Sequence, residues 1–197
     1  MNQSERMMAW YNESLKIYGI GDYRSLTWGS SDGKSAKLRY DIMNSITPFS
    51  DKSIIEFGCG WGSFFDFGFT CKSYHGIDIN SEFVKIASQN YKEHSFEVLD
   101  VLESKINKKY DLAISSGVAG NQGGPADHPT KLKKYLQLMY DCSDIAMVNF
   151  PSTWATIRSN NIEYFSPSST LEIALSVTEN VTLIHKSKSD FLIVLSK

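Results

Sequence analysis

The chain has 197 residues, 42% of them hydrophobic and 21% charged, so it is long enough for one well-filled domain and has an ordinary globular composition. Its formal net charge of -2 excludes a general attraction to nucleic-acid backbones or anionic membranes, and no apolar run approaches membrane-spanning length. The three cysteines, at positions 59, 71 and 142, have neither paired nor metal-ligand spacing, so we expect reduced thiols in a cytoplasmic protein without a metal site.

The N-terminal part of the chain predicts two helices. Apolar residues of the first keep 3/4 spacing along one face: Met8, Tyr11, Leu15 and Tyr18. After the polar loop LTWGSSDGKS, the segment AKLRYDIMNSI predicts a second helix, which Pro48 prevents from continuing. We expect Leu38, Ile42 and Ile46 on the apolar face of this second helix.

Strands and helices alternate from residue 53 onward. Short apolar runs predict strands at SIIEFG, SYHGIDI, SFEVLDV, KYDLAISS and DIAMVNF. Helical patterns alternate with them at WGSFFDFGF, SEFVKIASQNY, TKLKKYLQLMYDC and STLEIALSV. The closing runs NVTLIHK and DFLIVLSK favour an antiparallel hairpin. The pattern predicts an α/β fold with a doubly wound, mostly parallel sheet, helices on both faces and one antiparallel strand.

The loop after the first strand, GCGWG at 58–62, has glycine at every second position and follows Glu56. Glycine permits positive φ and close approach of a ligand to the backbone, and ligands of open α/β sheets bind beyond the carboxyl ends of the strands. Ser63 stands where a dinucleotide fingerprint needs its third glycine, and Glu56 would repel a pyrophosphate but suit a positive centre. A plain tight turn is the alternative.

Two more acids end the next two strands. Asp78 lies 20 residues beyond Gly58, where a carboxylate can accept both ribose hydroxyls, and Asp100 is placed to accept from an adenine amino group. The implied ligand is an adenosine with an amino-acid tail and no phosphate. Alternatively, Asp78 is a favourable charge at a helix N-terminus and Asp100 is a solvated loop acid.

The motifs IIEFGCGWG, YHGIDIN, SFEVLDV and YDLAISSG, in this order and spacing, resemble those of class I S-adenosylmethionine-dependent methyltransferases. The resemblance implies a seven-stranded sheet whose last strand is antiparallel, S-adenosyl-L-methionine as cofactor, and one domain with a helical cap at 1–48 and a Rossmann-like core at 50–197. It implies cofactor contacts at these residues: Glu56, Gly58, Cys59, Gly60, Asp78, Ile79, Asp100, Val101 and Ser115. Ser115 and its neighbour Ser116 would border the transferred methyl group.

The segment TWGSSDGKSAKLRY resembles a narrower group of bacterial methyltransferases, some of them encoded with surface-polysaccharide genes. This likeness implies that Trp28, Gly29, Ser30 and Arg39 fold over the cofactor. Arg39 would pair the cofactor carboxylate, because a guanidinium fork suits a carboxylate bidentately. A solvated helix arginine is the alternative.

The segment GVAGNQGGPADHPTK follows the fourth predicted strand, where methyltransferases admit the acceptor. His128 is our candidate general base, since its intrinsic pKa lies near neutral, and Asp127 would orient it. The alternative is that either residue caps the helix that begins near Pro129.

The sequence therefore predicts a methyltransferase acting at oxygen or nitrogen of a small molecule or a sugar or glycan precursor, as a monomer or homodimer without nucleic-acid or membrane partners. SSGVAG occupies the place of the Asn/Asp-Pro-Pro-aromatic motif of nucleic-acid amino-methylating enzymes, and no basic stripe is present. A nicotinamide-dependent oxidoreductase, which Glu56 opposes, and an inactive cofactor-binding partner subunit are the alternatives.

Overall fold

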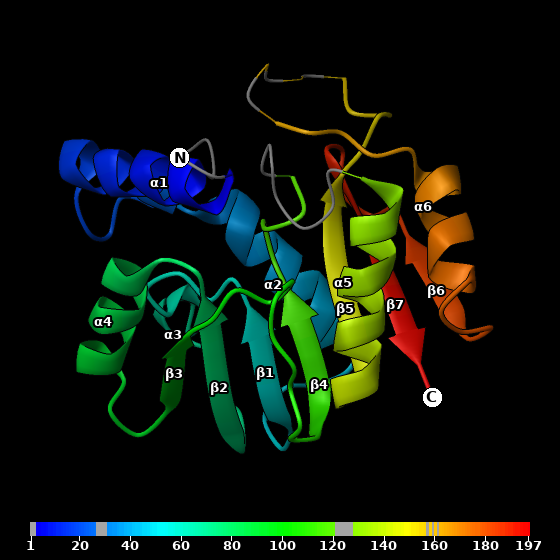
Figure 1. Ribbon diagram of the computed structural model, residues 1–197, viewed down its shortest axis with the longest axis horizontal. Helices are drawn as coiled ribbons and strands as arrows, with labels where there is room; N and C mark the ends of the chain where they lie inside the picture. The colour runs from blue at the N-terminus through cyan, green and yellow to red at the C-terminus, as the bar shows by residue number, and fades with distance from the viewer. Residues whose placement is uncertain (1–2, 27–30, 121–127, 157, 159, 161) are drawn as a thin grey trace.

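The structure is a computed structural model that describes residues 3–26, 31–120, 128–156, 158, 160 and 162–197. Within these residues, seven strands form one sheet in the order β3-β2-β1-β4-β5-β7-β6 (Figure 1). The strands are β1 Ser53–Phe57, β2 Ser73–Asp78, β3 Ser95–Val98, β4 Tyr110–Ser115, β5 Ser143–Pro151, β6 Val181–Ile184 and β7 Asp190–Ser196. Neighbours pair in parallel, except that β7 runs antiparallel to both β5 and β6. The predicted sheet is thus confirmed.

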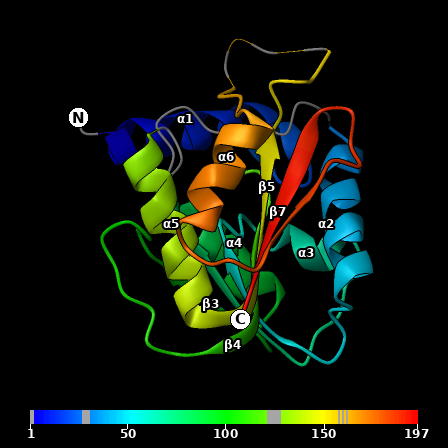
Figure 2. The same cartoon turned by 90° about the vertical axis from the view of Figure 1, so that its right-hand side faces the viewer.

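Helices cover both faces of this sheet (Figure 2). They are α1 Gln3–Tyr18, the 3-10 helix η1 Tyr23–Leu26, α2 Lys34–Ile46, α3 Ser63–Asp66, α4 Ser81–Asn90, α5 Pro129–Cys142 and α6 Pro167–Leu175. Helices α2 and α3 pack on one core cluster with Ile54 and Leu112 of the sheet, whereas α5 and α6 pack on a second cluster with Ile55 and Phe57. Consecutive strand residues point to opposite faces, so a continuous apolar run serves both clusters.

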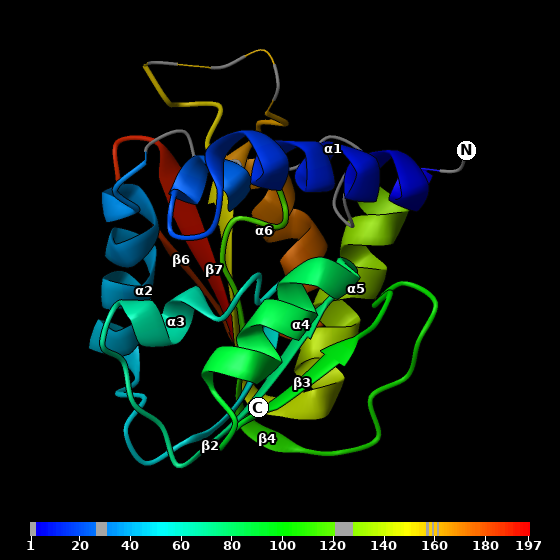
Figure 3. The same ribbon diagram turned by 90° about the vertical axis from the view of Figure 1, so that its left-hand side faces the viewer.

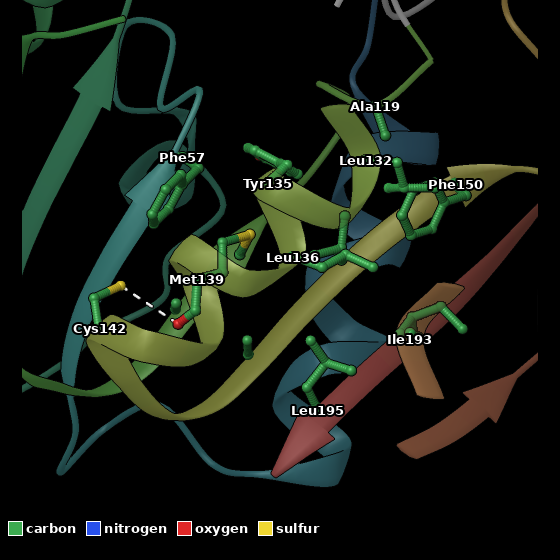
Figure 4. Packing of buried hydrophobic residues seen from close by; sticks show 14 of the residues in the cluster. Phe57, Ala119, Leu132, Tyr135, Leu136, Met139, Cys142, Phe150, Ile193 and Leu195 are labelled. Carbon is green, nitrogen blue, oxygen red and sulfur yellow. Dashed lines mark hydrogen bonds between the residues drawn. The ribbon is translucent and has the colours of Figure 1, made fainter. Parts of the chain in front are cut away.

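Helix α5 carries the second cluster. Its residues Tyr135, Leu136 and Met139 are fully buried and lie among Phe57 of β1 and Ile193 of β7 (Figure 4). This packing holds α5 against the sheet.

The buried face of α2 differs from the predicted one. Leu38 is 47% exposed, so the expectation that it lies on the apolar face was wrong. The fully buried residues are Ala36, Tyr40 and Met43, while Ile42 packs at the edge. We attribute the rotation to Tyr40, whose hydroxyl donates a hydrogen bond to the buried carboxylate of β1. The 3/4 apolar pattern did not reveal that a tyrosine would define this face.

Helix α1 lies over the carboxyl ends of the parallel strands (Figures 1 and 3). Tyr23 and Leu26 of η1 form a third cluster with Trp61, after β1, and Phe83 of α4. Asn80 caps α4 by accepting hydrogen bonds from the backbone N–H groups of residues 82 and 83. This arrangement places the N-terminal segment directly above the glycine loop.

Candidate active site

The glycine loop has the backbone that the sequence predicts. Gly58, Gly60 and Gly62 all have positive φ, at 76°, 54° and 88°. The backbone N–H of Gly58 donates to the carbonyl of Ile77 in β2 at 2.7 Å. A Cβ at Gly58 would lie 2.1 Å from Cγ2 of Val118, so glycine is required there by both conformation and space.

Protein side chains, however, already lie against two of the other glycines. The Cβ position of Gly60 is 2.9 Å from Cδ2 of Leu26, and that of Gly62 is 2.8 Å from the Tyr91 ring. Gly60 and Gly62 therefore also make room for the N-terminal cap and for the end of α4, and the binding of a ligand by this loop stays a prediction.

Asp78 closes the loop from the end of β2. Its Oδ2 accepts from the backbone N–H of Gly60 at 2.9 Å, and its Oδ1 accepts from that of Asn80 at 2.8 Å. Burial raises the pKa of Asp78, and the backbone hydrogen bonds oppose that rise. A backbone hydrogen bond from Ile79 also stabilises this carboxylate. Asn80 supplies the side-chain cap of α4, and both the ribose role of Asp78 and its alternative as a favourable charge at the helix N-terminus stay predictions.

Glu56 lies on the core face of β1, completely buried. Tyr40 of α2 donates to its Oε1 at 2.5 Å, and the Tyr74 hydroxyl of β2 donates to its Oε2. Burial raises the pKa of Glu56 to about 7, and the two tyrosine hydrogen bonds work against this rise. The carboxylate therefore ties α2 to the sheet, and its predicted contact with a cofactor tail stays a prediction.

The other predicted cofactor residues line the ends of β1 to β3. Cys59 is buried against Gly76 of β2, so its backbone rather than its thiol belongs to the loop surface. Asp100 follows β3, and its Oδ1 accepts from the backbone N–H of Leu102 at 3.1 Å. Val101 and Ile79 are half-buried beside these acids. The structure thus brings the predicted adenosine residues to one edge of the sheet.

The end of β4 turns toward α5 and β5. The Tyr135 hydroxyl donates to Oγ of Ser115 at 2.7 Å, and Oγ of the buried Ser116 has no hydrogen-bond partner among the described residues. The backbone N–H of Gly117 donates to Oδ1 of Asn149 at 2.7 Å. Sequence reasoning assigned Asn149 no role.

Arg39 reaches toward β7. Its Nε donates to Oδ2 of Asp190 at 3.0 Å, with 15% of the Arg39 side chain and 8% of the Asp190 side chain exposed. Since β4 and β5 separate β7 from β1, this contact lies on the opposite side of the sheet centre from Asp78. Pairing of Arg39 with the cofactor carboxylate stays a prediction, and the solvated alternative is wrong.

His128 is exposed and caps α5. Its Nδ1 accepts from the backbone N–H of Thr130 at 3.3 Å, and Pro129 follows at the first helical position. The capping alternative is thus confirmed for His128, and its role as a base stays a prediction. The remaining predicted site residues lie outside the described residues: Trp28, Gly29, Ser30 and Asp127.

Among the residues that the structure describes, no group of three or more His, Cys, Asp or Glu residues could hold a metal ion. No helix in this part of the chain is long and apolar enough to cross a membrane.

The strand order, the antiparallel β7, the glycine loop after β1 and the acid after β2 together define the fold of the class I S-adenosylmethionine-dependent methyltransferases. The predicted resemblance is confirmed at the level of the fold.

Solved structures with this fold match almost the whole chain. A TehB-like SAM-dependent methyltransferase from Corynebacterium glutamicum is 18% identical, with a TM-score of 0.64 over 96% of this chain and 98% of its own. Magnesium protoporphyrin IX methyltransferase from Synechocystis, with S-adenosylhomocysteine bound, is 13% identical, with a TM-score of 0.67 over 98% of each chain. The N-methyltransferase NodS from Bradyrhizobium japonicum, in complex with S-adenosylhomocysteine, is 16% identical, with a TM-score of 0.64 over 93% and 96%.

Sequence comparison finds a shorter likeness. Over 93 residues, or 44% of this chain, 29% are identical to the protein named "Putative methyltransferase 235L" from Invertebrate iridescent virus 6. The match spans 35% of the length of that relative. No protein-family model matches the chain.

Proposed function

We propose that the protein transfers a methyl group from S-adenosylmethionine to an oxygen or nitrogen of a small molecule or a sugar or glycan precursor. The observation that carries the proposal is the hydrogen bond between Asp78 and the backbone N–H of Gly60. This hydrogen bond joins Asp78, an acid suited to bind ribose hydroxyls, to the glycine loop, whose positive-φ backbone suits the amino-acid tail of the cofactor. Two solved structures of the same fold hold S-adenosylhomocysteine, which supports this ligand class.

The acids of the site fit this cofactor. Glu56 is negative when ionised, and neither it nor Asp78 is paired with a lysine or arginine in the described part of the chain, so a pyrophosphate would meet repulsion and a cationic ligand would not. Bound here, the cofactor would supply an electrophilic methyl group. Asp78 would hold the ribose hydroxyls, Asp100 the adenine amino group, and the loop backbone the amino-acid tail.

The protein's remaining task is to align the acceptor, with the reacting atoms roughly 3–3.5 Å apart. A hydroxyl acceptor needs a base, whereas a neutral amine does not. His128 caps α5 through Nδ1, so its neutral ring carries the proton on Nε2 and has no lone pair there. His128 would have to release the cap before it took a proton, which favours a neutral amine or an acceptor that is already ionised.

Calorimetric titration with S-adenosylhomocysteine and, separately, with NAD tests the proposal. We expect saturable binding of S-adenosylhomocysteine and none of NAD. Binding of NAD alone would reject the proposal in favour of a nicotinamide-dependent oxidoreductase. A protein that binds S-adenosylhomocysteine but methylates nothing in an extract of its own cells would instead be an inactive partner subunit.

A further inference from the structure

We propose that a small pocket on the acceptor side of the sheet binds an anionic group, a carboxylate or a phosphate, of the methyl acceptor. This inference rests on the proposed function and names the chemistry of its acceptor. Residues of α2, β5, β6, β7 and the turn from β6 to β7 line the pocket, and its polar lining comes from Arg39, Asn149, Lys186, Ser187 and Asp190. The pocket is small, so it suits a functional group rather than a whole molecule.

Asn149 supplies an unused donor. Its side chain is 3% exposed, and its oxygen must face Gly117 because the backbone N–H there can only donate. The amide nitrogen Nδ2 therefore points elsewhere, and it has no hydrogen-bond partner among the described residues. A buried polar group without a partner costs about 1–3 kcal/mol, which an acceptor atom of a ligand would recover.

Arg39 supplies the charge. Asp190 takes its Nε, and Ser189 also donates to Oδ2 of Asp190, at 3.2 Å. Asp190 thus holds the guanidinium in place through one edge, and the terminal nitrogens make no hydrogen bond that the described residues show. With Lys186 at the exposed rim, the three charged side chains sum formally to +1. A positive pocket with free N–H donors matches a monoanion with planar oxygens.

The position of the pocket assigns this anion to the acceptor. Asn149 is hydrogen-bonded to Gly117, which follows the end of β4 where Ser115 and Ser116 would border the transferred methyl. Arg39 points to β7, which lies beyond β4 and β5 as seen from the glycine loop. A group held here would therefore extend an acceptor away from the adenosine half. Ile42 and Leu192 give the pocket apolar walls for the adjoining carbon chain.

Titration of the protein saturated with S-adenosylhomocysteine tests the inference. Saturation fills the cofactor site, including the place of the cofactor carboxylate, so an added anion cannot bind there. The probes are hexanoate, methyl phosphate and, as a neutral control, hexanamide, at constant ionic strength. NMR of the Asn149 side-chain amide reports binding. We expect saturable shifts with at least one anion and none with hexanamide, and the tighter anion identifies the group.

Two variants and a control complete the test. Asn149→Asp keeps an oxygen for Gly117 but removes the donor, and Arg39→Gln removes the charge. Each should weaken anion binding at least about tenfold, as expected for a charge-assisted hydrogen bond, followed by chemical shifts of other residues around the pocket. Lys188→Ala, on the same turn but outside the pocket, should leave binding unchanged.

The failures are distinguishable. If S-adenosylhomocysteine binds but neither anion does, the pocket inference is overturned and the proposed function stands. If Arg39→Gln weakens S-adenosylhomocysteine and not the anions, Arg39 serves the cofactor and the inference is again overturned. If S-adenosylhomocysteine does not bind at all, the proposed function fails, and the same anion titration on the unliganded protein decides the pocket.

Discussion

The two halves of the site are built in different ways. In the cofactor half, Asp78 and the loop at Gly60 are 18 residues apart, and a direct hydrogen bond joins them across neighbouring parallel strands. In the half that we propose for the acceptor, the contact between Gly117 and Asn149 spans 32 residues. The backbone conformation of one strand–loop–strand unit therefore determines the cofactor half. The packing of elements that are distant in the sequence determines the acceptor half.

The ion pair of the acceptor half extends this contrast. Arg39 and Asp190 are 151 residues apart, and they meet only because α2 packs across to the antiparallel β7. Substitutions in the first half should therefore act through backbone conformation and cofactor affinity. Substitutions in the second should act through side chains, with smaller effects on the fold.

Gly58→Ala should have the largest effect. An alanine there combines a positive φ with a clash at Val118, which together should lower the free energy of unfolding by about 3 kcal/mol. Urea unfolding measures it. Adding Val118→Ala should restore the part due to the clash and leave the part due to φ. If the single variant were as stable as the wild type, the cofactor half would not be conformationally fixed.

Asp78→Ala should come next. Losing two charge-assisted hydrogen bonds to a ribose should weaken S-adenosylhomocysteine binding about a hundredfold, as measured by calorimetry. Asp78→Asn is the matched control, since its oxygen can still accept from Gly60, and it should lose about tenfold. Undiminished binding in both variants would remove Asp78 from the cofactor site.

Glu56 should give the protein a pH dependence. Its folded pKa of about 7 lies above the ordinary value of 4.5, so between these values the folded state binds the proton more tightly than the unfolded state does. Stability from this group is therefore fully present below pH 4.5 and falls as pH rises to about 7. From about pH 5 to pH 8, the wild type should lose about 2 kcal/mol relative to Glu56→Gln in urea unfolding. Parallel pH profiles for the two proteins would contradict this.

His128 should have the smallest effect on the fold. Removal of the cap in His128→Ala should cost about 0.5–1 kcal/mol in thermal unfolding, while His128→Asn, with a good capping side chain, should cost nothing. The turnover rate distinguishes the role of His128 as a helix cap from its role as a general base. A drop of at least about tenfold in both variants identifies a base, and a drop in neither removes His128 from the chemistry.

The same contrast explains what the sequence could predict. The sheet and its antiparallel strand followed from apolar runs, and the glycine loop with Asp78 followed from spacing within one strand–loop–strand unit. Leu38 was placed wrongly because the face of α2 is set by a hydrogen bond from Tyr40 to a strand. The unpaired Asn149 donor was missed because the hydrogen bond that orients this side chain comes from Gly117 in the loop after β4, and no periodicity encodes such a contact.

The contact between Leu26 and Gly60 has a consequence for ligand exchange at the glycine loop. A Cβ on Gly60 would lie 2.9 Å from Cδ2 of Leu26, so η1 packs directly against this glycine. If the proposed cofactor rests on the same loop, its exchange would require η1 to lift. The frequency of that lifting, rather than the bond-making step, would cap the number of cycles each molecule completes per second.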